Sequence, residues 1–324
     1  MSAAPRLSVV IPTYRRPELL ARCLAAALTQ SIDRQAYEVI VVDDGHDDAT
    51  RAQVEGMQPA GDAPALRYVR PAQGRGPAVA RNAGWRAARG TLIAFTDDDT
   101  IPDRRWLEEG ERAIGRCVAI CGRVVVPPVD EPPTDHELMT RGLEAAEFVT
   151  ANAFVWREAL ERVGGFDERF GRAWREDSDL QFRLAQLGDV QRAGSATVLH
   201  PVRRERWGVC LRQQRNAFFD ALLYKKHPRL YRERIRRVPP WDYYAIVALV
   251  PAAALLLPAR QAVAAATCAS LALLLVMRIA WKRLRHTSHS PAHVVEMVAT
   301  SALIPFLSVY WRLRGALAFR VPFL

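Results

Sequence analysis

The sequence has few of the residues that would support a disulfide scaffold or a cysteine metal site. Its 324 residues include five cysteines without C-x-x-C spacing, at Cys23, Cys117, Cys121, Cys210 and Cys268. This scatter excludes a zinc ribbon and a disulfide framework, and it predicts reduced cysteines in the core of a cytosolic domain. The chain also lacks internal repeats and notable low-complexity tracts, so a repeat architecture is not expected.

Acidic residues are outnumbered by basic ones, 35 against 45, which gives a net charge of +10. The excess is concentrated between Arg203 and Arg237, where twelve Lys/Arg accompany three Asp/Glu. Such a block indicates an anionic neighbour, either lipid, phosphate or nucleic acid. We expect no nucleic-acid partner, because an apolar C-terminal region follows the block directly.

Short apolar runs alternate with helical patterns through the first 200 residues. Runs rich in β-branched residues predict strands, and apolar residues at helical spacing predict the helices between them. The predicted strands are 7–11, 38–42, 66–69, 91–96, 118–126, 151–156 and 196–199, and helices are expected to begin near 17, 78, 102, 134, 157 and 176. The alternation predicts an α/β fold with a mostly parallel sheet and helices on both faces.

Acidic residues cluster at the ends of two predicted strands. The clusters are Asp43-Asp44 after the run 38–42 and Asp97-Asp98-Asp99 after the run 91–96. α/β sheets bind ligands at the carboxyl ends of their strands, so both clusters are expected at a ligand-binding edge. Three adjacent carboxylates repel one another unless a cation lies among them, and a divalent cation that also binds phosphate oxygens would serve. The alternative is an Asp-rich turn that caps the helix expected near Pro102.

Long apolar runs are confined to the chain after Pro240. Three runs, at 243–257, 262–277 and 294–311, each approach the roughly 20 residues that cross a bilayer. The first two are separated by a short link and are expected to form a hairpin. The third contains Glu296 and Pro305, so a re-entrant or interfacial position is the alternative to a span. Buried helices of a soluble protein are disfavoured, because three such runs come in a row.

Basic residues flank the predicted hairpin at both outer ends, in 232–237 and 278–285. The positive-inside rule then places the N-terminal domain in the cytoplasm, at the inner (cytoplasmic) membrane. We therefore predict an N-terminal α/β domain over 1–202, a basic amphipathic juxtamembrane region over 203–240 and a membrane region over 241–324 with two or three apolar helices.

Six short motifs occur in a characteristic order along the first 180 residues. They are Ser8-Val9-Val10-Ile11-Pro12-Thr13-Tyr14-Arg15-Arg16, Val41-Val42-Asp43-Asp44-Gly45, Ala80-Arg81-Asn82-Ala83-Gly84, Thr96-Asp97-Asp98-Asp99, Gly164-Gly165-Phe166-Asp167-Glu168 and Glu176-Asp177-Ser178-Asp179-Leu180. No single motif is specific, but together over residues 7 to 200 the chain resembles family 2 glycosyltransferases with the GT-A fold.

The resemblance implies an inverting transfer from a nucleotide-diphosphate sugar, with Mn²⁺ or Mg²⁺ as cofactor. A UDP-sugar is the first expectation, with a GDP- or dTDP-sugar as alternatives. The residues implied for nucleotide-sugar binding are Pro12, Thr13, Tyr14, Asp44, Arg81, Asp97 and Asp98, and Asn82 is a further candidate beside Arg81. The implied metal ligands are Asp99, Asp97 and His200. Separately, an ordinary turn at Asp43-Asp44-Gly45 and a structural role for His200 remain alternatives.

Inversion needs a general base beside the attacking hydroxyl. By resemblance Asp177 is that base, with Glu176 as the second candidate, and the start of a helix favours the carboxylate form of either residue. An acidic helix cap is the structural alternative. Trp174 is predicted to stack on an acceptor sugar and Asp167 to line the acceptor site, although a core role for Trp174 and a turn role for Asp167 are equally compatible with the sequence.

The basic residues after His200 have two interpretations. Arg203, Arg204, Arg206 and Trp207 are placed to close over a diphosphate, or to form a basic face on anionic lipid. The sequence Gln213-Gln214-Arg215-Asn216 lacks the tryptophan of the Gln-x-x-Arg-Trp motif that processive polysaccharide synthases carry, so processivity is not expected.

The sequence therefore predicts a membrane-associated enzyme that transfers a sugar to a hydroxyl of a lipid-linked or cell-envelope glycan acceptor. One rival is a polyprenyl-phosphate glycosyltransferase, whose phosphate acceptor needs no strong base. The other rival is a non-catalytic membrane scaffold that retains the fold. The intact acids at 97–99 and 176–177 disfavour the scaffold.

Overall fold

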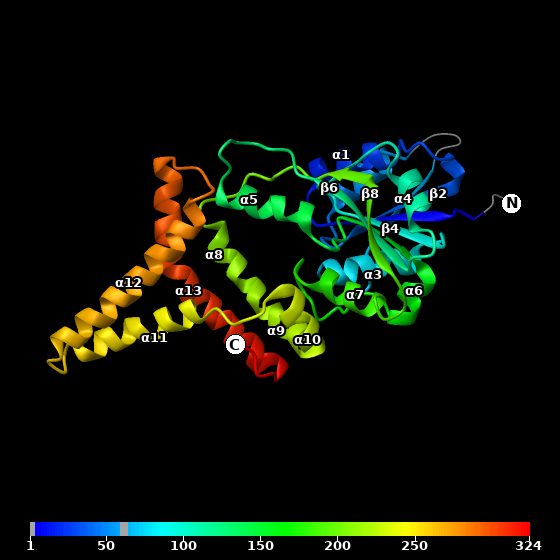
Figure 1. The fold of residues 1–324 in the computed structure, drawn as a ribbon. Helices are drawn as coiled ribbons and strands as arrows, with labels where there is room; N and C mark the ends of the chain where they lie inside the picture. Colours follow the sequence, from blue (N-terminus) through cyan, green and yellow to red (C-terminus); the bar gives the residue numbers. More distant parts are fainter. Residues whose placement is uncertain (1–3, 59–63) are drawn as a thin grey trace. The chain divides into compact units, whose positions relative to one another are not determined.

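The computed structural model describes residues 4–58 and 64–324, and the chain divides into two compact units (Figure 1). Unit 1 comprises Met1–Pro127 and Arg141–Pro201, and unit 2 comprises Pro128–Thr140 and Val202–Leu324. The assignment of 128–140 to unit 2 was not foreseen from the sequence, where this stretch reads as part of the N-terminal domain.

Within the described residues, eight strands of unit 1 form one sheet in the order β3-β2-β1-β4-β7-β6-β8-β5. The strands are β1 (Leu7–Thr13), β2 (Tyr37–Asp43), β3 (Ala65–Val69), β4 (Leu92–Thr96), β5 (Ile101–Pro102), β6 (Ala119–Val125), β7 (Asn152–Trp156) and β8 (Val190–Leu199). The pairs β1–β2, β2–β3, β1–β4 and β6–β8 are parallel, and β7 runs antiparallel to both of its neighbours. The predicted α/β class is confirmed, with a mixed sheet whose first four strands are parallel.

The central strands are buried on both faces. Every residue of β2 and β4 is buried, as are six of the seven residues of β1. Their sequences are near-continuous apolar runs, as expected for parallel strands covered by helices. Helix α3 packs closely against this layer at Gly84. A Cβ built on Gly84 would lie only 2.3 Å from Val10 Cγ1.

The helices of unit 1 are α1 (Pro17–Ala27), η1 (Arg34–Ala36), α2 (Asp48–Gly56), α3 (Pro77–Ala87), α4 (Trp106–Ile114), η2 (Gly142–Ala145), α6 (Arg157–Val163) and α7 (Glu176–Leu184). Of these, η1 and α2 were not predicted, and α4 begins later than predicted. Helix α2 was not predicted, because its only buried residues are Thr50 and Val54 and its main signal is the Asp47 side chain, which accepts from Thr50 N. The helix expected from Pro102 begins only at Trp106. Pro102 belongs instead to the short strand β5, where it pairs with Val198 of β8.

Unit 2 is helical, and α5 (Asp135–Arg141) begins in its first segment. The later elements are α8 (Val209–Gln213), η3 (Gln214–Asn216), α9 (Ala217–Lys226), α10 (Pro228–Leu230), the π-helix η4 (Tyr231–Ile235), α11 (Trp241–Leu256), α12 (Ala262–Leu284) and α13 (Pro291–Phe319). Helices α11 and α12 pack side by side as a hairpin (Figure 1). By length and composition α12 and α13 are apolar enough to cross a membrane, and α11 is a shorter apolar helix.

Candidate functional site

The strand order creates a switch point at the carboxyl ends of β1 and β4. The chain proceeds from β1 outward to β2 and β3, and then returns to β4 on the other side of β1. Ligands of open α/β sheets bind in the crevice that such a reversal leaves. Thr13 ends β1 and the acidic turn Asp97-Asp98-Asp99 follows β4, so both lie at this crevice.

Hydrogen bonds and an ion pair from neighbouring residues hold the acidic turn in position. Thr13 Oγ1 donates to Asp98 Oδ2 at 2.8 Å, and Arg16 Nη1 lies 3.3 Å from Asp98 Oδ1. The backbone of the turn is closed by Thr100 Oγ1, which donates to Asp97 O at 2.8 Å. Burial and the neighbouring Asp99 charge raise the pKa of Asp98 to about 6. The Thr13 hydroxyl therefore orients Asp98, and Arg16 is a member of the site that sequence reasoning left without a role.

Arg81 joins this turn to the second acidic motif. Its guanidinium is almost fully buried and lies 2.7 Å from Asp97 Oδ1 and 3.0 Å from Glu176 Oε1. Helix α3 supplies Arg81 and helix α7 supplies Glu176, so residues 95 positions apart meet in one ion-pair network. Charge-assisted contacts of this kind fix the relative position of the two carboxylates.

The acid pair at the start of α7 lies in a poorly solvated environment. Burial, followed by the charge of Asp177, raises the pKa of Glu176 despite its contact with Arg81. Burial also raises the pKa of Asp177, against the opposing hydrogen bond from Ser178 N at 2.7 Å. Glu176 is buried, whereas Asp177 is partly exposed. Of the two, only Asp177 is therefore accessible to a molecule that approaches from solvent.

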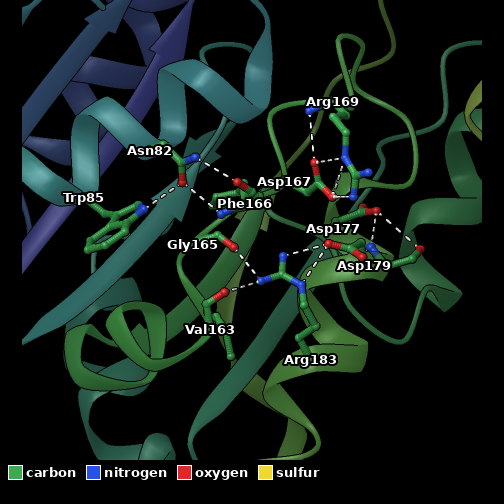
Figure 2. A network of polar contacts seen from close by, with 11 residues as sticks. Asn82, Trp85, Val163, Gly165, Phe166, Asp167, Arg169, Asp177, Asp179 and Arg183 are labelled. Carbon is green, nitrogen blue, oxygen red and sulfur yellow. Dashed lines mark hydrogen bonds and ion pairs between the residues drawn. The ribbon is translucent and has the colours of Figure 1, made fainter. Parts of the chain in front are cut away.

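A polar network holds α7 against the loop that precedes it (Figure 2). Arg183 binds Asp179 at 2.7 Å and donates to the carbonyls of Val163 and Gly165 at 2.8 and 2.7 Å. The pair Asp179–Arg183 spans one turn of α7 and connects that helix to the end of α6. These contacts position the first turn of α7, which carries Glu176 and Asp177.

Asn82 fastens the same loop from α3, as Figure 2 shows. Its Nδ2 donates to Phe166 O and to Glu168 Oε1, both at 2.8 Å, while its Oδ1 accepts from Trp85 Nε1 and Phe166 N. All of these partners belong to the protein, so the amide is already bonded within the fold. Asn82 therefore supports the loop, and its contact with a base or phosphate stays a prediction.

Asp99 and His200 meet although they are far apart in sequence. Strand β5 follows the acidic turn and pairs with the end of β8, Ile101 opposite Leu199, which brings His200 Nε2 to 3.7 Å from Asp99 Oδ1. His200 Nδ1 is buried and lacks a hydrogen-bond partner among the described residues. A divalent ion binds its ligands at roughly 2.0 to 2.6 Å, so two atoms 3.7 Å apart are within reach of one ion. Across residues 4–58 and 64–324, no three His, Cys, Asp or Glu side chains form a metal-binding group, and Asp97 instead contacts Arg81.

The two acids after β2 have different surroundings. Asp43 is fully buried, and its carboxylate accepts from Gly45 N, Asp47 N and Tyr68 Oη, so it shapes the turn. Asp44 accepts from Gly76 N with both oxygens, at 3.0 and 2.9 Å, and remains partly exposed. A partly exposed carboxylate retains lone pairs that an N–H donor of a ligand can use.

Two aromatic side chains follow or precede elements of the site, Tyr14 after β1 and Trp174 before α7. Tyr14 is 48% exposed, and the Arg15 guanidinium lies 5.6 Å from its ring. Trp174 is partly exposed just before α7, with the Arg175 guanidinium 4.5 Å from its ring. Arg175 adopts a left-handed φ of 74°, an uncommon conformation for a residue with a side chain, and this turn directs the chain into α7. The predicted acceptor residue Asp167 pairs with Arg169 at 2.6 Å.

Comparison with known proteins identifies relatives for this arrangement. The family model described as Glycosyl transferase family 2 matches residues 8–169, which ends before Glu176 and Asp177. Glycosyltransferase AglE of Haloferax volcanii is 31% identical over 176 residues, covering 51% of this chain and 57% of the relative. Validoxylamine A glucosyltransferase of Streptomyces hygroscopicus subsp. jinggangensis is 29% identical over 279 residues, covering 72% and 63%. The chain thus spans less than two thirds of the length of these curated relatives.

A solved structure resembles the whole chain. The mannosyltransferase PcManGT from Pyrobaculum calidifontis, in complex with GDP-Man and Mn²⁺, superposes with a TM-score of 0.58 at 22% identity, covering 97% of this chain and 88% of that one. At this identity the likeness concerns the fold, and the predicted GT-A architecture is confirmed.

Proposed function

Because the chain belongs to glycosyl transferase family 2, we propose that it is a membrane-associated inverting glycosyltransferase that uses a nucleotide-diphosphate sugar. The observation that carries the proposal is the double contact of Arg81 with Asp97 and Glu176. It joins the acids expected to hold the donor to the acid pair expected to activate the acceptor. A reaction between two substrates needs these groups beside each other.

The donor nucleotide is assigned to the carboxyl ends of β1, β2 and β4. Exposed Tyr14 and the backbone near Pro12 offer a flat surface for the base, and Asp44 offers an acceptor for a base N–H. Asp97 is assigned to the ribose, with Asp98 held beside it by Thr13. A base with a ring N–H, as in UDP-, GDP- or dTDP-sugars, suits a carboxylate acceptor.

Asp99 and His200 are the residues that would hold Mn²⁺ or Mg²⁺, with diphosphate oxygens as further ligands. When bound, the ion would supply Lewis-acid stabilisation of the leaving diphosphate. The atom of His200 that faces Asp99 is Nε2, so this nitrogen, in the neutral form of the ring, is the one that would bind the ion.

Asp177 is assigned as the general base. Glu176 is buried with one oxygen on Arg81, whereas Asp177 is partly exposed and its Oδ1 is held by Ser178 N. Asp177 would take the proton of the acceptor hydroxyl as the hydroxyl oxygen bonds to the anomeric carbon and the nucleoside diphosphate leaves. Attack from the face opposite the leaving group inverts the configuration.

The acceptor is assigned to the membrane. The two candidate spans, together with the apolar hairpin partner α11, support a lipid-linked or cell-envelope glycan acceptor. The basic residues at the outer ends of the α11–α12 hairpin support an orientation with unit 1 in the cytoplasm, at the inner membrane. Trp174 and Asp167 are assigned to acceptor contacts in unit 1.

The test is Asp177→Asn in the full-length protein. Loss of a general base should lower transfer by about 10² to 10⁴-fold, while binding of the nucleotide sugar, screened among UDP-, GDP- and dTDP-sugars by thermal protection, changes little. The matched control is Asp189→Asn, an exposed acid of the same unit outside the site. Full transfer by the Asp177 variant would reject this residue as the base, and loss only in Glu176→Gln would transfer the role to Glu176.

A further inference from the structure

Unit 2 contains a cavity of about 340 Å³ that the proposed reaction does not use. It is formed by residues 129–137, residues 202–210 and the first turns of α13, all within that unit. We call it the juxtamembrane cavity. Its wall includes Arg204, Arg206, Trp207, His136 and Met297.

Five carboxylates line the cavity, of which four are engaged by the protein itself and the fifth, Asp130, is exposed. Glu137 accepts from Thr134 N, and Glu296 accepts from Gly208 N at 2.7 Å. Asp135 and Glu205 form ion pairs with arginines, at 2.9 and 3.2 Å. Four carboxylates that line the cavity are therefore already hydrogen-bonded or neutralised.

The basic groups of the wall offer donors that the protein does not use. In the part of the chain that the structure describes, Arg204 and Arg206 make no side-chain hydrogen bond or ion pair, and both are exposed. His136 Nε2 lies 3.2 Å from Arg203 O, while His136 Nδ1 is buried without a hydrogen-bond partner. Because the carbonyl of Arg203 can only accept, His136 Nε2 donates to it and Nδ1 is an acceptor in the neutral ring. The donors available to a phosphate group are therefore the two unpaired guanidiniums.

The cavity wall also carries apolar side chains and adjoins the long helices. Met297 lies in α13, and Trp207 is 57% exposed. Arg283, near the end of α12, binds Asp135 of the cavity wall and also Thr300 and Ser301 of α13. The cavity therefore adjoins the basic end of α12, where an apolar helix meets the polar interface of a bilayer.

We propose that the juxtamembrane cavity binds the phosphate head group of a membrane lipid, with Arg204 and Arg206 on the phosphate and the Trp207 ring beside the first carbons of the chain. The proposal rests on the membrane attachment proposed above and is independent of sugar transfer. A phosphate ion alone would pair with the arginines but leave the apolar side chains of the wall exposed to water. A neutral lipid would cover those apolar side chains but leave the arginines unpaired.

The test measures binding of radiolabelled farnesyl phosphate to the full-length protein in a non-ionic detergent by equilibrium dialysis. Farnesol has the same chain without the phosphate, and inorganic phosphate lacks the chain. We expect farnesyl phosphate to bind at least ten-fold more tightly than either one. The variant R204Q/R206Q should weaken its binding at least ten-fold, because two charge-assisted contacts are lost. The control R236Q/R237Q removes the same charge from exposed positions outside the cavity and should leave binding unchanged.

Three results would overturn the proposal. Equal binding of farnesol means that the phosphate is not recognised, and equal loss in both double variants means that only the overall charge matters. If R204Q/R206Q weakens binding of GDP or UDP but not of farnesyl phosphate, the loop serves the donor diphosphate instead. Because nothing here depends on transfer, failure of the Asp177 test leaves this result interpretable.

Discussion

Arg81 is the residue on which the charge balance of the site depends. It contacts acids that are 16 and 95 positions away in the sequence. Arg81 and Glu176 are buried, and Asp97 is partly exposed. A buried ion pair is poor evidence of net stability, but removing one partner leaves the others as uncompensated charges. The effect of this residue is therefore measurable by deletion.

Arg81→Ala should lower the free energy of unfolding by about 3 to 5 kcal/mol, because the buried Glu176 and the partly exposed Asp97 lose their shared cation. Arg86→Ala is the matched control on the same helix, where the side chain is 55% exposed and Nη1 lies 3.4 Å from Glu168 Oε1. Exposed pairs contribute about 0 to 1 kcal/mol. Thermal or denaturant unfolding of both variants gives the comparison, and equal losses would contradict a special role for Arg81.

The pH dependence of transfer should report Asp177. The base must be ionised to accept a proton, and burial raises the pKa of Asp177 above the ordinary 3.8. On acidification, kcat/KM should therefore begin to fall at a higher pH than for a solvated aspartate, with a limiting slope of one. Nucleotide-sugar binding measured over the same range separates this fall from loss of the donor. If kcat/KM stays constant down to the pKa of an ordinary aspartate, the assignment of Asp177 as the general base is contradicted.

The same pKa direction has a consequence for stability. A carboxyl whose pKa is raised on folding binds more protons in the native state than in the unfolded chain between the two pKa values. Its contribution to stability is therefore present at low pH and is lost as the pH rises through that window. Asp177→Asn removes this unfavourable term, so we expect it to be at least as stable as the parent at neutral pH while inactive.

At the scale of elements, α3 is the helix that connects the sheet to the site. It carries Arg81 toward the acids and Asn82 toward the loop before α7, and Gly84 lets its backbone approach β1. The arrangement requires a glycine, since any side chain there would meet Val10 and Val42 in the buried strands.

Gly84→Ala should therefore destabilise the protein by about 1 to 3 kcal/mol, because the added methyl group must displace packed core side chains. A Cβ at Gly84 would lie 2.3 Å from Val10 Cγ1 and 2.9 Å from Val42 Cγ2. Gly56→Ala is the control, since no atom lies within 4 Å of a Cβ built there. Melting temperatures of the two variants test the expectation. A Gly84 variant with the same melting temperature as the parent would show that α3 can shift away from the sheet without loss of stability.

At the scale of the whole molecule, the chain combines a mixed α/β unit with a helical unit that carries the apolar runs. The middle of α12 exposes Leu273 and Leu274, at 61% and 66% of their surface. Adjacent leucines exposed at the centre of a 23-residue apolar helix are expected for a lipid-facing surface.

The variant L273R/L274R should reduce membrane integration, because an arginine at the centre of a span costs about 2.5 to 3.5 kcal/mol. The fraction of protein that resists carbonate extraction from membranes is the measurement. Val238→Arg is the control, an exposed apolar residue outside the long helices. If both variants stay in the pellet to the same extent as the parent, α12 does not span the bilayer.

Much of the fold could be predicted because its signals are local. The predicted strands at 7–11, 38–42, 66–69 and 151–156 overlap β1, β2, β3 and β7, since each is a short apolar run bounded by turn residues. The elements that could not be predicted also have a physical explanation. Helix α2 buries too little to leave a pattern, and Pro102 pairs with a strand that follows it by almost a hundred residues.

The sequence by itself determined the chemistry that is available: acids at strand ends, an acid pair at a helix start, a basic block and apolar runs. Those are properties of neighbouring residues, and short-range periodicity is enough to place them. Only the tertiary structure decided the partners. It joined Arg81 to Glu176, Asp99 to His200, and Asn82 to its loop. These contacts depend on how strands and helices pack, and packing brings together residues between which the sequence carries no local signal.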